Sequence, residues 1–406
     1  MVDRGYRLTR RSLLLSAGTL ALIPWLSGCT QGQAALKVLL LEGSIPPQLL
    51  NEFRKQLTRG KELSFKPKAQ LKDLFSLLQA WQKKPGVKEN QQNWLPFAQT
   101  RTPAIADLVT LGDYWLREAI EQQLIQPLRI EQLTGWQDLH PQWQQLVKRN
   151  SRGELDEKGA IWGAPYRWGS TMLAYRRDKF KSLGWKPSDW QDLWREELRD
   201  RISLLDQPRE AIGLTLKKLG YSYNTQDLTA VANLKSELLS LQQQVKFYSS
   251  ENYLQPLILG DTWLAVGWST DILPVQKRYP QIEAVIPRSG TALWADLWVK
   301  PKPLTSDNTQ STSLETGNAL SISEQWINFC WQSKPASQIS LFTDAISPSI
   351  LTMKEDEIPK DIRKNPLLLP DAQIIKNSEF ILPLPPEITK QYLSLWEEIP
   401  SQIRNS

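Results

Sequence analysis

The side chains that most often carry catalysis or hold metals are scarce in this chain. Its 406 residues include one histidine, His140, and two cysteines, Cys29 and Cys330. His140 precedes a proline in a loop-like stretch, and Cys330 lies in an apolar stretch that is typical of a buried, inert thiol. A zinc or copper site gathers several such ligands in one place. The sequence therefore predicts no metal site and no cofactor.

The chain also lacks the patterns that activate a nucleophile. It contains no phosphate-binding loop, no dinucleotide-binding glycine pattern and no zinc-protease motif. The nearest approach to a nucleophile elbow is Gly-Trp-Ser-Thr-Asp at 267–271, which lacks the second glycine and a nearby histidine. Catalysis is therefore disfavoured, and we expect a protein that binds its ligand without transforming it.

Eighteen tryptophans are the outstanding feature of the composition. Indoles fill large cores, and they also form walls against ligands. Trp294 and Asp296 stand two positions apart on a predicted strand, where alternate side chains face the same way. Two interpretations stay open for this pair: a shared binding site, or a core tryptophan beside a surface aspartate.

Trp268 and Glu210 have similar pairs of interpretations. Trp268 is close to Trp263, which indicates that core indoles are plentiful in this part of the chain. Glu210 stands at the start of a predicted helix, where a carboxylate is common because it interacts favourably with the helix dipole. Arg167 is open between a contact in a cleft and an ion pair at the surface. Five further tryptophans are interpreted as packing residues: Trp162, Trp168, Trp190, Trp194 and Trp326.

The N-terminus has the three parts of an export signal. Residues 1–12 are basic, residues 13–26 are apolar, and Leu-Ser-Gly-Cys follows at 26–29. The apolar run is shorter than the ~20 residues that span a bilayer, so we predict a cleaved signal peptide over 1–28. This signal holds four basic residues and one acidic residue, which leaves the rest of the chain nearly neutral. Such a balance disfavours nucleic-acid binding.

Leu-Ser-Gly-Cys resembles the lipobox of bacterial lipoproteins, in which the cysteine is acylated and becomes the first residue of the mature protein. The resemblance implies lipidation at Cys29, a tether over 29–35 and a membrane anchor supplied by the lipid. Ordinary secretion is the alternative. Residues 9–14 are similar to a twin-arginine signal, although the Sec route explains the basic residues almost as well. Either route predicts a periplasmic protein.

Apolar periodicity predicts an α/β fold. Residues 36–41 and 106–111 are short apolar runs typical of buried strands, and helical patterns follow at 48–57 and from Tyr114. Strands that alternate with helices at this spacing indicate βα units. Further helices are predicted over 228–246 and 386–398, and surface insertions over 83–102 and 301–321.

The middle of the chain carries an ordered series of motifs, of which Leu-Trp-Ala-Asp at 293–296 is one. The motifs lie at 164–175, 188–194, 204–210, 219–225, 264–269 and 286–296. Together they resemble the spermidine/putrescine-binding proteins of bacterial ABC importers, over about 36–400. The resemblance implies a type II periplasmic-binding-protein fold, with two α/β lobes joined by crossover strands and a ligand cleft between them. We expect one lobe over 36–164 plus about 295–350, and the other over 165–294 plus about 351–406.

The resemblance also implies which residues bind the ligand. A polyamine is a thin apolar chain with cationic ends, so carboxylates would bind its ammonium groups and indole faces would cover its methylenes. By motif, Asp296 would be the main amine-binding carboxylate and Glu210 another, and Tyr114 would lie on the facing lobe. The full set of expected ligand-binding residues is Asp296, Trp294, Trp268, Glu210, Gln207, Tyr114 and Glu42.

Three departures from the family pattern change the expected cleft. Gln207 is neutral at a position where polyamine binders usually have an aspartate. The stretch Leu-Glu-Gly-Ser at 41–44 replaces a loop with two aromatics, and leaves Glu42 as a displaced acid. Arg167 adds a cation beside the crossover. We therefore expect a wider, less acidic cleft, for a ligand that also carries a negative group.

The leading hypothesis is a monomeric binding protein that captures a polyamine-like solute and delivers it to the permease of an ABC importer. A second hypothesis is a binding protein for another small solute, zwitterionic or chelated. A third is a lipoprotein with a decayed pocket and a structural role. Trp294, Asp296 and Glu210 favour the first hypothesis over the third, whereas Gln207 and the altered first loop favour the second or the third.

Overall fold

The computed structural model describes residues 35–57, 61–82, 105–303 and 320–399, all of which belong to one compact unit. The predicted signal peptide, Cys29 and nearly all of the tether 29–35 lie outside these residues. The predicted insertion 83–102 and most of the insertion 301–321 lie outside them as well. These assignments stay predictions.

The first strands and helices follow the apolar pattern of the sequence. β1 (Leu36–Leu41) pairs in parallel with β2 (Leu63–Lys68) and with β3 (Leu108–Gly112). α1 (Pro47–Gln56) and α2 (Leu71–Gln82) bury their apolar sides, and a proline at the first helical position begins α1. The predicted strand 36–41 is confirmed, and the predicted helix 48–57 is confirmed with a shift of one residue.

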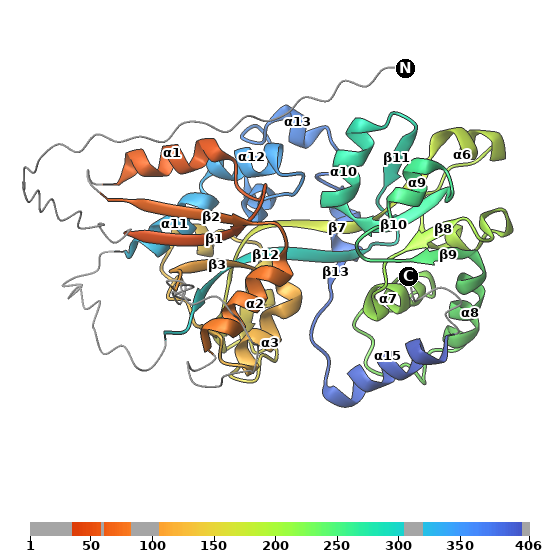
Figure 1. The fold of residues 1–406 in the computed structure, drawn as a ribbon, viewed down its shortest axis with the longest axis horizontal. Coiled ribbons are helices and arrows are strands. Elements are labelled where there is room, and N and C mark those ends of the chain that lie inside the picture. Colours follow the sequence, from red (N-terminus) through yellow and green to blue (C-terminus); the bar gives the residue numbers. More distant parts are fainter. Residues whose placement is uncertain (1–34, 58–60, 83–104, 304–319, 400–406) are drawn as a thin grey trace, which may run out of the picture. The chain divides into compact units, whose positions relative to one another are not determined.

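Two long antiparallel strands connect two halves of the sheet. β7 (Ala164–Arg176) pairs with β12 (Ala292–Pro301), in a sheet with the strand order β2-β1-β3-β12-β7-β10-β8-β9. Figure 1 shows β7 and β12 extending from the β1–β3 strands toward β8, β9 and β10. Trp168 on β7 packs in one hydrophobic cluster and Leu173, five residues later, packs in another. β7 therefore carries the chain from one core to the next.

The second half of the sheet is built around β10 (Leu264–Trp268). This strand pairs antiparallel with β7 and parallel with β8 (Ile202–Leu204), and β8 pairs in turn with β9 (Val245–Tyr248). α7 (Pro208–Lys218) is buried from Glu210 to Leu216, which places the start of this helix next to the sheet. The predicted closing helix is confirmed as α15 (Pro386–Glu398), which contacts α7.

The helix predicted over 228–246 is shorter than expected at both ends. α8 (Leu234–Gln244) begins only after Asn233, whose φ of 64° is left-handed and cannot continue a helix. The last predicted residues belong to β9, because Val245, Phe247 and Tyr248 favour a strand.

The remaining elements are mostly short. The predicted helix from Tyr114 begins as a single 3-10 turn, η1 (Asp113–Trp115), and continues as α3 (Leu116–Glu121). The other strands are β4 (Ile125–Gln126), β5 (Lys148–Arg149), β6 (Ala160–Ile161), β11 (Ile282–Val285) and β13 (Glu379–Phe380). The other helices are α4 (Thr134–Gln137), α5 (Pro141–Val147), α6 (Arg177–Leu183), η2 (Trp190–Trp194), η3 (Glu196–Leu198), α9 (Gln255–Leu259), α10 (Ser269–Arg278), α11 (Ile322–Trp331), α12 (Ser333–Phe342), η4 (Pro348–Thr352), α13 (Lys360–Arg363) and α14 (Ala372–Asn377).

Buried hydrophobic side chains define two lobes among the described residues. Lobe 1 is the cluster that includes β1, β3 and α11, and lobe 2 is the pair of clusters around β8, β10 and α7. Ile362 and Phe380 pack in lobe 1, although the predicted ranges assign residues after about 351 to lobe 2. Leu368 lies against clusters of both lobes. Because this segment contacts both lobes, the predicted domain ranges stay a prediction.

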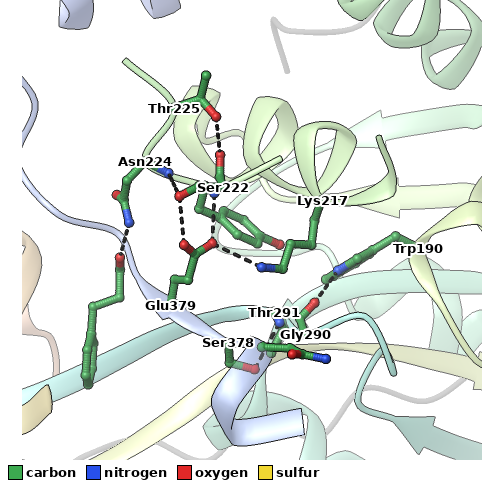
Figure 2. Close-up of polar contacts among 12 residues, drawn as sticks. Trp190, Lys217, Ser222, Asn224, Thr225, Gly290, Thr291, Ser378 and Glu379 are labelled. Carbon is green, nitrogen blue, oxygen red and sulfur yellow. Dashed lines mark hydrogen bonds and ion pairs between the residues drawn. The ribbon is translucent and has the colours of Figure 1, made fainter. Parts of the chain in front are cut away.

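The chain passes between the lobes again near its C-terminal end, from Phe380 in lobe 1 to Leu384 in lobe 2. Glu379, at the start of this passage, accepts hydrogen bonds from Ser222 Oγ at 2.7 Å and from Lys217 Nζ at 3.1 Å. Figure 2 shows the carboxylate of Glu379 pointing toward both side chains. These charge-assisted bonds attach the passage to lobe 2.

Candidate functional site

A cavity of about 590 Å³ is lined by residues of both lobes. Six of the seven expected ligand-binding residues line it: Asp296, Trp294, Trp268, Glu210, Gln207 and Tyr114. Glu42 does not line the cavity, because it is exposed beyond the end of β1, while its neighbour Leu41 does line it. The volume is that of a site for a small molecule.

Asp296 lies in the middle of β12 and is 1% exposed. The register of β12 on β7 places Arg167 directly opposite. The Arg167 Nε donates to Asp296 Oδ2 at 2.6 Å, and its guanidinium also donates to the Thr343 carbonyl oxygen at 3.4 Å. Both charged side chains line the cavity. Arg167, which the sequence left open between two interpretations, therefore forms an ion pair that is buried and also lines the cavity wall.

Arg167 and Asp296 form a buried ion pair. Burial by itself would lower the pKa of the Arg167 guanidinium, but Asp296 and Tyr166 together outweigh this effect, so that the pKa is raised. Burial raises the pKa of the Asp296 carboxyl, although Arg167 lowers it. A buried ion pair roughly balances desolvation against attraction, whereas removal of one partner costs about 3–5 kcal/mol because the other charge stays buried alone. The carboxylate that was expected to bind an amine therefore already has a cation.

Glu210 differs from Asp296, because one of its carboxylate oxygens has no hydrogen-bond partner among the described residues. Pro208 begins α7 and sets Glu210 in its first turn, where the side chain is 6% exposed. Its Oε1 accepts hydrogen bonds from Thr171 Oγ1 at 2.9 Å and from the Trp268 indole N–H at 3.3 Å. Its Oε2 is buried and has no hydrogen-bond partner among the described residues. A buried carboxylate oxygen without a donor suits a ligand that brings one.

Burial raises the pKa of Glu210 to about 7, although the hydrogen bonds from Thr171 and Trp268 lower it. Burial thus favours the neutral form of Glu210 up to about pH 7 when no cation is bound. A cationic ligand would favour the ionised form and would lower the pKa again. The binding of such a ligand is therefore linked to the release of a proton.

Trp268 is held in place by a tyrosine behind it. The Tyr253 hydroxyl accepts from the Trp268 backbone N–H at 3.1 Å and donates to Asp271 at 2.8 Å. The rings of Tyr253 and Trp268 meet edge to face, with centroids 6.3 Å apart. Trp294, on crossover strand β12, also lines the cavity, and the Arg167 guanidinium lies 6.0 Å from its ring centroid.

Lobe 1 contributes Asp113 and Tyr114 to the cavity. Asp113 Oδ1 accepts from the Ala295 backbone N–H at 2.9 Å, which ties the start of η1 to β12. The pKa of Asp113 is raised to about 7, because burial and the nearby charge of Asp296 together outweigh the lowering by the Ala295 hydrogen bond and by Arg149. Tyr114 is 65% exposed, so its ring is free to cover a ligand.

Several lining residues were not among those predicted from sequence. Lys72 of α2 and Glu251 of lobe 2 form an ion pair of 3.1 Å across the cavity, although 179 positions separate them. Nothing in the sequence marks either residue, because both are ordinary exposed side chains there. Asp271 follows Trp268 by three positions, in the first turn of α10. This spacing could have indicated that Asp271 lines the same cavity as Trp268. Arg209 and Asp113 are the other charged residues of the lining that the prediction omitted.

The tryptophans that were interpreted as packing residues do not line the cavity. Trp168, Trp190 and Trp326 are at most 1% exposed, and Trp162 and Trp194 pack against the hydrophobic clusters. Cys330 is fully buried, and burial raises the pKa of its thiol well above the ordinary range. His140 is exposed and begins α5, where its ring accepts from the Gln142 backbone N–H. Within the described ranges, no helix is long and apolar enough to cross a membrane.

The cavity, its position between two α/β lobes and its mixed carboxylate and indole lining define a binding protein for a small solute. Residues 104–378 match the bacterial extracellular solute-binding protein family, and the chain belongs to this family.

Named relatives cover most of the chain. The spermidine/putrescine-binding periplasmic protein of Escherichia coli K12 is 25% identical over 312 residues, which are 75% of this chain and 82% of the relative. The spermidine/putrescine-binding periplasmic protein 1 of Haemophilus influenzae is 24% identical over 311 residues, which are 75% of this chain and 79% of the relative.

Solved structures establish the fold. The spermidine/putrescine substrate-binding protein of Streptococcus pneumoniae superposes with a TM-score of 0.69 at 19% identity, over 90% of this chain and 98% of that one. A periplasmic thiamin-binding protein superposes with a TM-score of 0.54 at 13% identity, over 90% of this chain and 96% of that one. These likenesses confirm the predicted type II periplasmic-binding-protein fold.

The raised pKa of Glu210 predicts how stability depends on pH. The folded carboxyl binds its proton up to about pH 7 and the unfolded one only up to about pH 4.5, so the ligand-free protein loses stability as pH rises between these values. Glu210→Gln removes this loss, because a glutamine stays neutral and its oxygen still accepts from Thr171. The difference in free energy of unfolding between the variant and the wild type should therefore increase by on the order of 2–3 kcal/mol from pH 4.5 to pH 8.

Urea unfolding at the two pH values checks this expectation, with Glu251→Gln as a control. The Glu251 side chain is 70% exposed, so its substitution should leave the pH dependence as it is. Equal pH dependence of Glu210→Gln and the wild type would show that the Glu210 carboxyl is already ionised in the folded protein.

Proposed function

We propose that this protein captures a small aliphatic amine of the polyamine class in the cavity between its lobes and delivers it to the permease of an ABC importer. The observation that carries the proposal is the buried Oε2 of Glu210, which has no donor among the described residues and belongs to a side chain that lines the cavity. An ammonium group is the donor that satisfies it best, since it also neutralises the buried charge. The named relatives, which bind spermidine and putrescine, support the same ligand class.

The lining supplies both kinds of contact that an aliphatic amine needs. A hydrogen bond from an ammonium group to a carboxylate contributes about 1.5–3 kcal/mol. An indole beside the cation adds about 0.5–2 kcal/mol, and Trp268 lies in position because its N–H is bonded to Glu210. Trp294 and Tyr114 offer apolar faces for methylene groups. Closure of the lobes on the ligand would give the permease one shape to recognise.

Binding without chemical change is part of this proposal. Among the described residues that line the cavity there is no cysteine, no histidine and no serine paired with a base. Its carboxylates are paired with Arg167 or Lys72, tied to a backbone N–H, or bonded to hydroxyl and indole groups. Such an arrangement supports a solute carrier. We propose that this carrier acts as a monomer.

We further propose that the protein is exported and then anchored to a membrane by lipidation of Cys29. The support is the sequence: a basic segment, a short apolar run and Leu-Ser-Gly-Cys at 26–29. The Sec and twin-arginine routes would both deliver it to the periplasmic side, where the relatives act.

Cells that express the wild type and are fed radiolabelled palmitate should contain a labelled protein in the membrane fraction. Cys29→Ala should lose the label and leave the membrane, because it removes the sulfur that would be acylated, whereas Cys330→Ala should do neither. Membrane association of Cys29→Ala equal to that of the wild type would exclude the lipid anchor.

Isothermal titration of the purified chain with putrescine, spermidine, spermine and their mono-N-acetyl derivatives tests the proposed ligand class. At least one of these amines should bind with a Kd in the micromolar range, and tryptophan fluorescence should change with it. Glu210→Gln should weaken that binding at least tenfold, because it replaces the free carboxylate oxygen with an amide group.

Glu196→Gln serves as the matched control, since Glu196 forms a surface ion pair with Arg199 and does not line the cavity. Its affinity should equal that of the wild type. An absence of heat and of fluorescence change with every amine up to millimolar concentration would refute the proposal.

A further inference from the structure

The position of Arg167 decides how many ammonium groups the cavity can hold. We propose that Arg167 is a specificity-determining residue, which selects a ligand with one ammonium group and an oxygen acceptor at its far end over a chain with an amine at each end. This inference rests on the proposed function, because it concerns which amine the same cavity takes. The candidates by chemistry are ω-amino acids and mono-acylated diamines.

The Glu210 end of the cavity binds the ammonium group. Arg209, the next residue toward the N-terminus, acts on Glu210 only through its charge, because its guanidinium donates its hydrogen bonds elsewhere: to the carbonyl oxygens of Leu382 at 3.1 Å and Tyr223 at 3.2 Å, and to Asn224 Oδ1 at 3.0 Å. Glu210 thus keeps a free, buried oxygen in a carboxylate that carries no ion-pair partner within salt-bridge distance among the described residues. The Glu210 end of the cavity can therefore bind one ammonium group.

The Asp296 end already holds its own cations. Three acids lie near this end, Asp113, Asp271 and Asp296, and Arg167 pairs with Asp296 at 2.6 Å. A second buried arginine, Arg149, is 2% exposed and attracts Asp113. Burial raises the pKa of all three carboxyl groups, which limits the negative charge that a second ammonium group could meet here. Buried charges without partners are strongly unfavourable.

An ammonium group could reach Asp296 only by competing with Arg167. The guanidinium is 5% exposed, and it is held by the carbonyl oxygen of Thr343 as well as by Asp296. Its backbone lies on β7, a central strand of the sheet. The competition would leave one of two cations buried without an anion, so a terminal ammonium group is rejected here.

An oxygen acceptor meets suitable donors at the same end. A guanidinium has five N–H donors, and Asp296, Thr343 and Tyr166 account for three partners of Arg167. The indole N–H of Trp294, which also lines the cavity, has no acceptor among the described residues. An amide or carboxylate oxygen of the ligand can bond these donors. The remaining ion pair of the lining, Lys72 with Glu251, is internally balanced and favours neither end.

Calorimetric titrations with three ligands of similar length test the inference: putrescine, N-acetylputrescine and 4-aminobutyrate. The wild type should bind N-acetylputrescine or 4-aminobutyrate at least tenfold more tightly than putrescine. The two capped ligands separate a neutral amide from a carboxylate, and a preference for either one supports the inference. Arg167→Met should reverse the order in favour of putrescine, because Asp296 then has no internal cation. Arg167→Lys, which keeps the charge, should retain the preference of the wild type.

A second variant keeps the test valid if Arg167→Met does not fold around an unpaired Asp296. Arg167→Met combined with Asp296→Asn removes both charges, and its affinities for putrescine and for the capped ligands should agree within about threefold. The inference is overturned if the wild type binds putrescine as tightly as both capped ligands, or if the variants without Arg167 keep the preference of the wild type. These results leave the proposed function intact, whereas a wild type that binds no amine at all refutes the proposed function itself.

Discussion

The pairing of β7 with β12 is the constraint on which the binding site depends. Both strands run through the two lobes, and their register sets Arg167 opposite Asp296, where a charge-assisted bond of 2.6 Å joins them. Because both side chains are almost fully buried, a shift of register would separate two charges that have no other partners of comparable strength. The ion pair is therefore consistent with only this alignment of the crossover strands, and it contributes both charges to the cavity wall.

The same alignment positions the rest of the site. Trp294 is two residues from Asp296 on β12, and Asp113 is tied to β12 through the Ala295 N–H. Trp268 ends β10, which pairs with β7 at Thr171, and Thr171 in turn donates to Glu210. One sheet thus connects the carboxylates and the indoles of both lobes. The free oxygen of Glu210 and the paired oxygen of Asp296 give the cavity two chemically different ends.

Much of the fold and part of the site could be predicted from the sequence. β1 and α15 follow from local apolar patterns, whereas the crossover strands were implied by the resemblance to the family. The ordered motifs of that family located six of the seven lining residues that were expected. Glu42 does not line the cavity, because it is exposed beyond the end of β1. The pairing of Arg167 with Asp296 was not predictable, since the two residues are 129 positions apart and only the strand register brings them together. Local patterns describe elements, whereas ion pairs across lobes depend on tertiary packing.

Nuclear magnetic resonance of the ¹⁵N-labelled indole groups tests the central claim that amines bind in this cavity, with signals assigned by single Trp→Phe variants. Putrescine and N-acetylputrescine would each be added to saturation. The account predicts that the indole signals of Trp268 and Trp294 shift with at least one of the two, and that those of the buried Trp143 and Trp326 stay in place. Unchanged signals of Trp268 and Trp294, with a measured heat of binding, would place the ligand elsewhere and contradict the account.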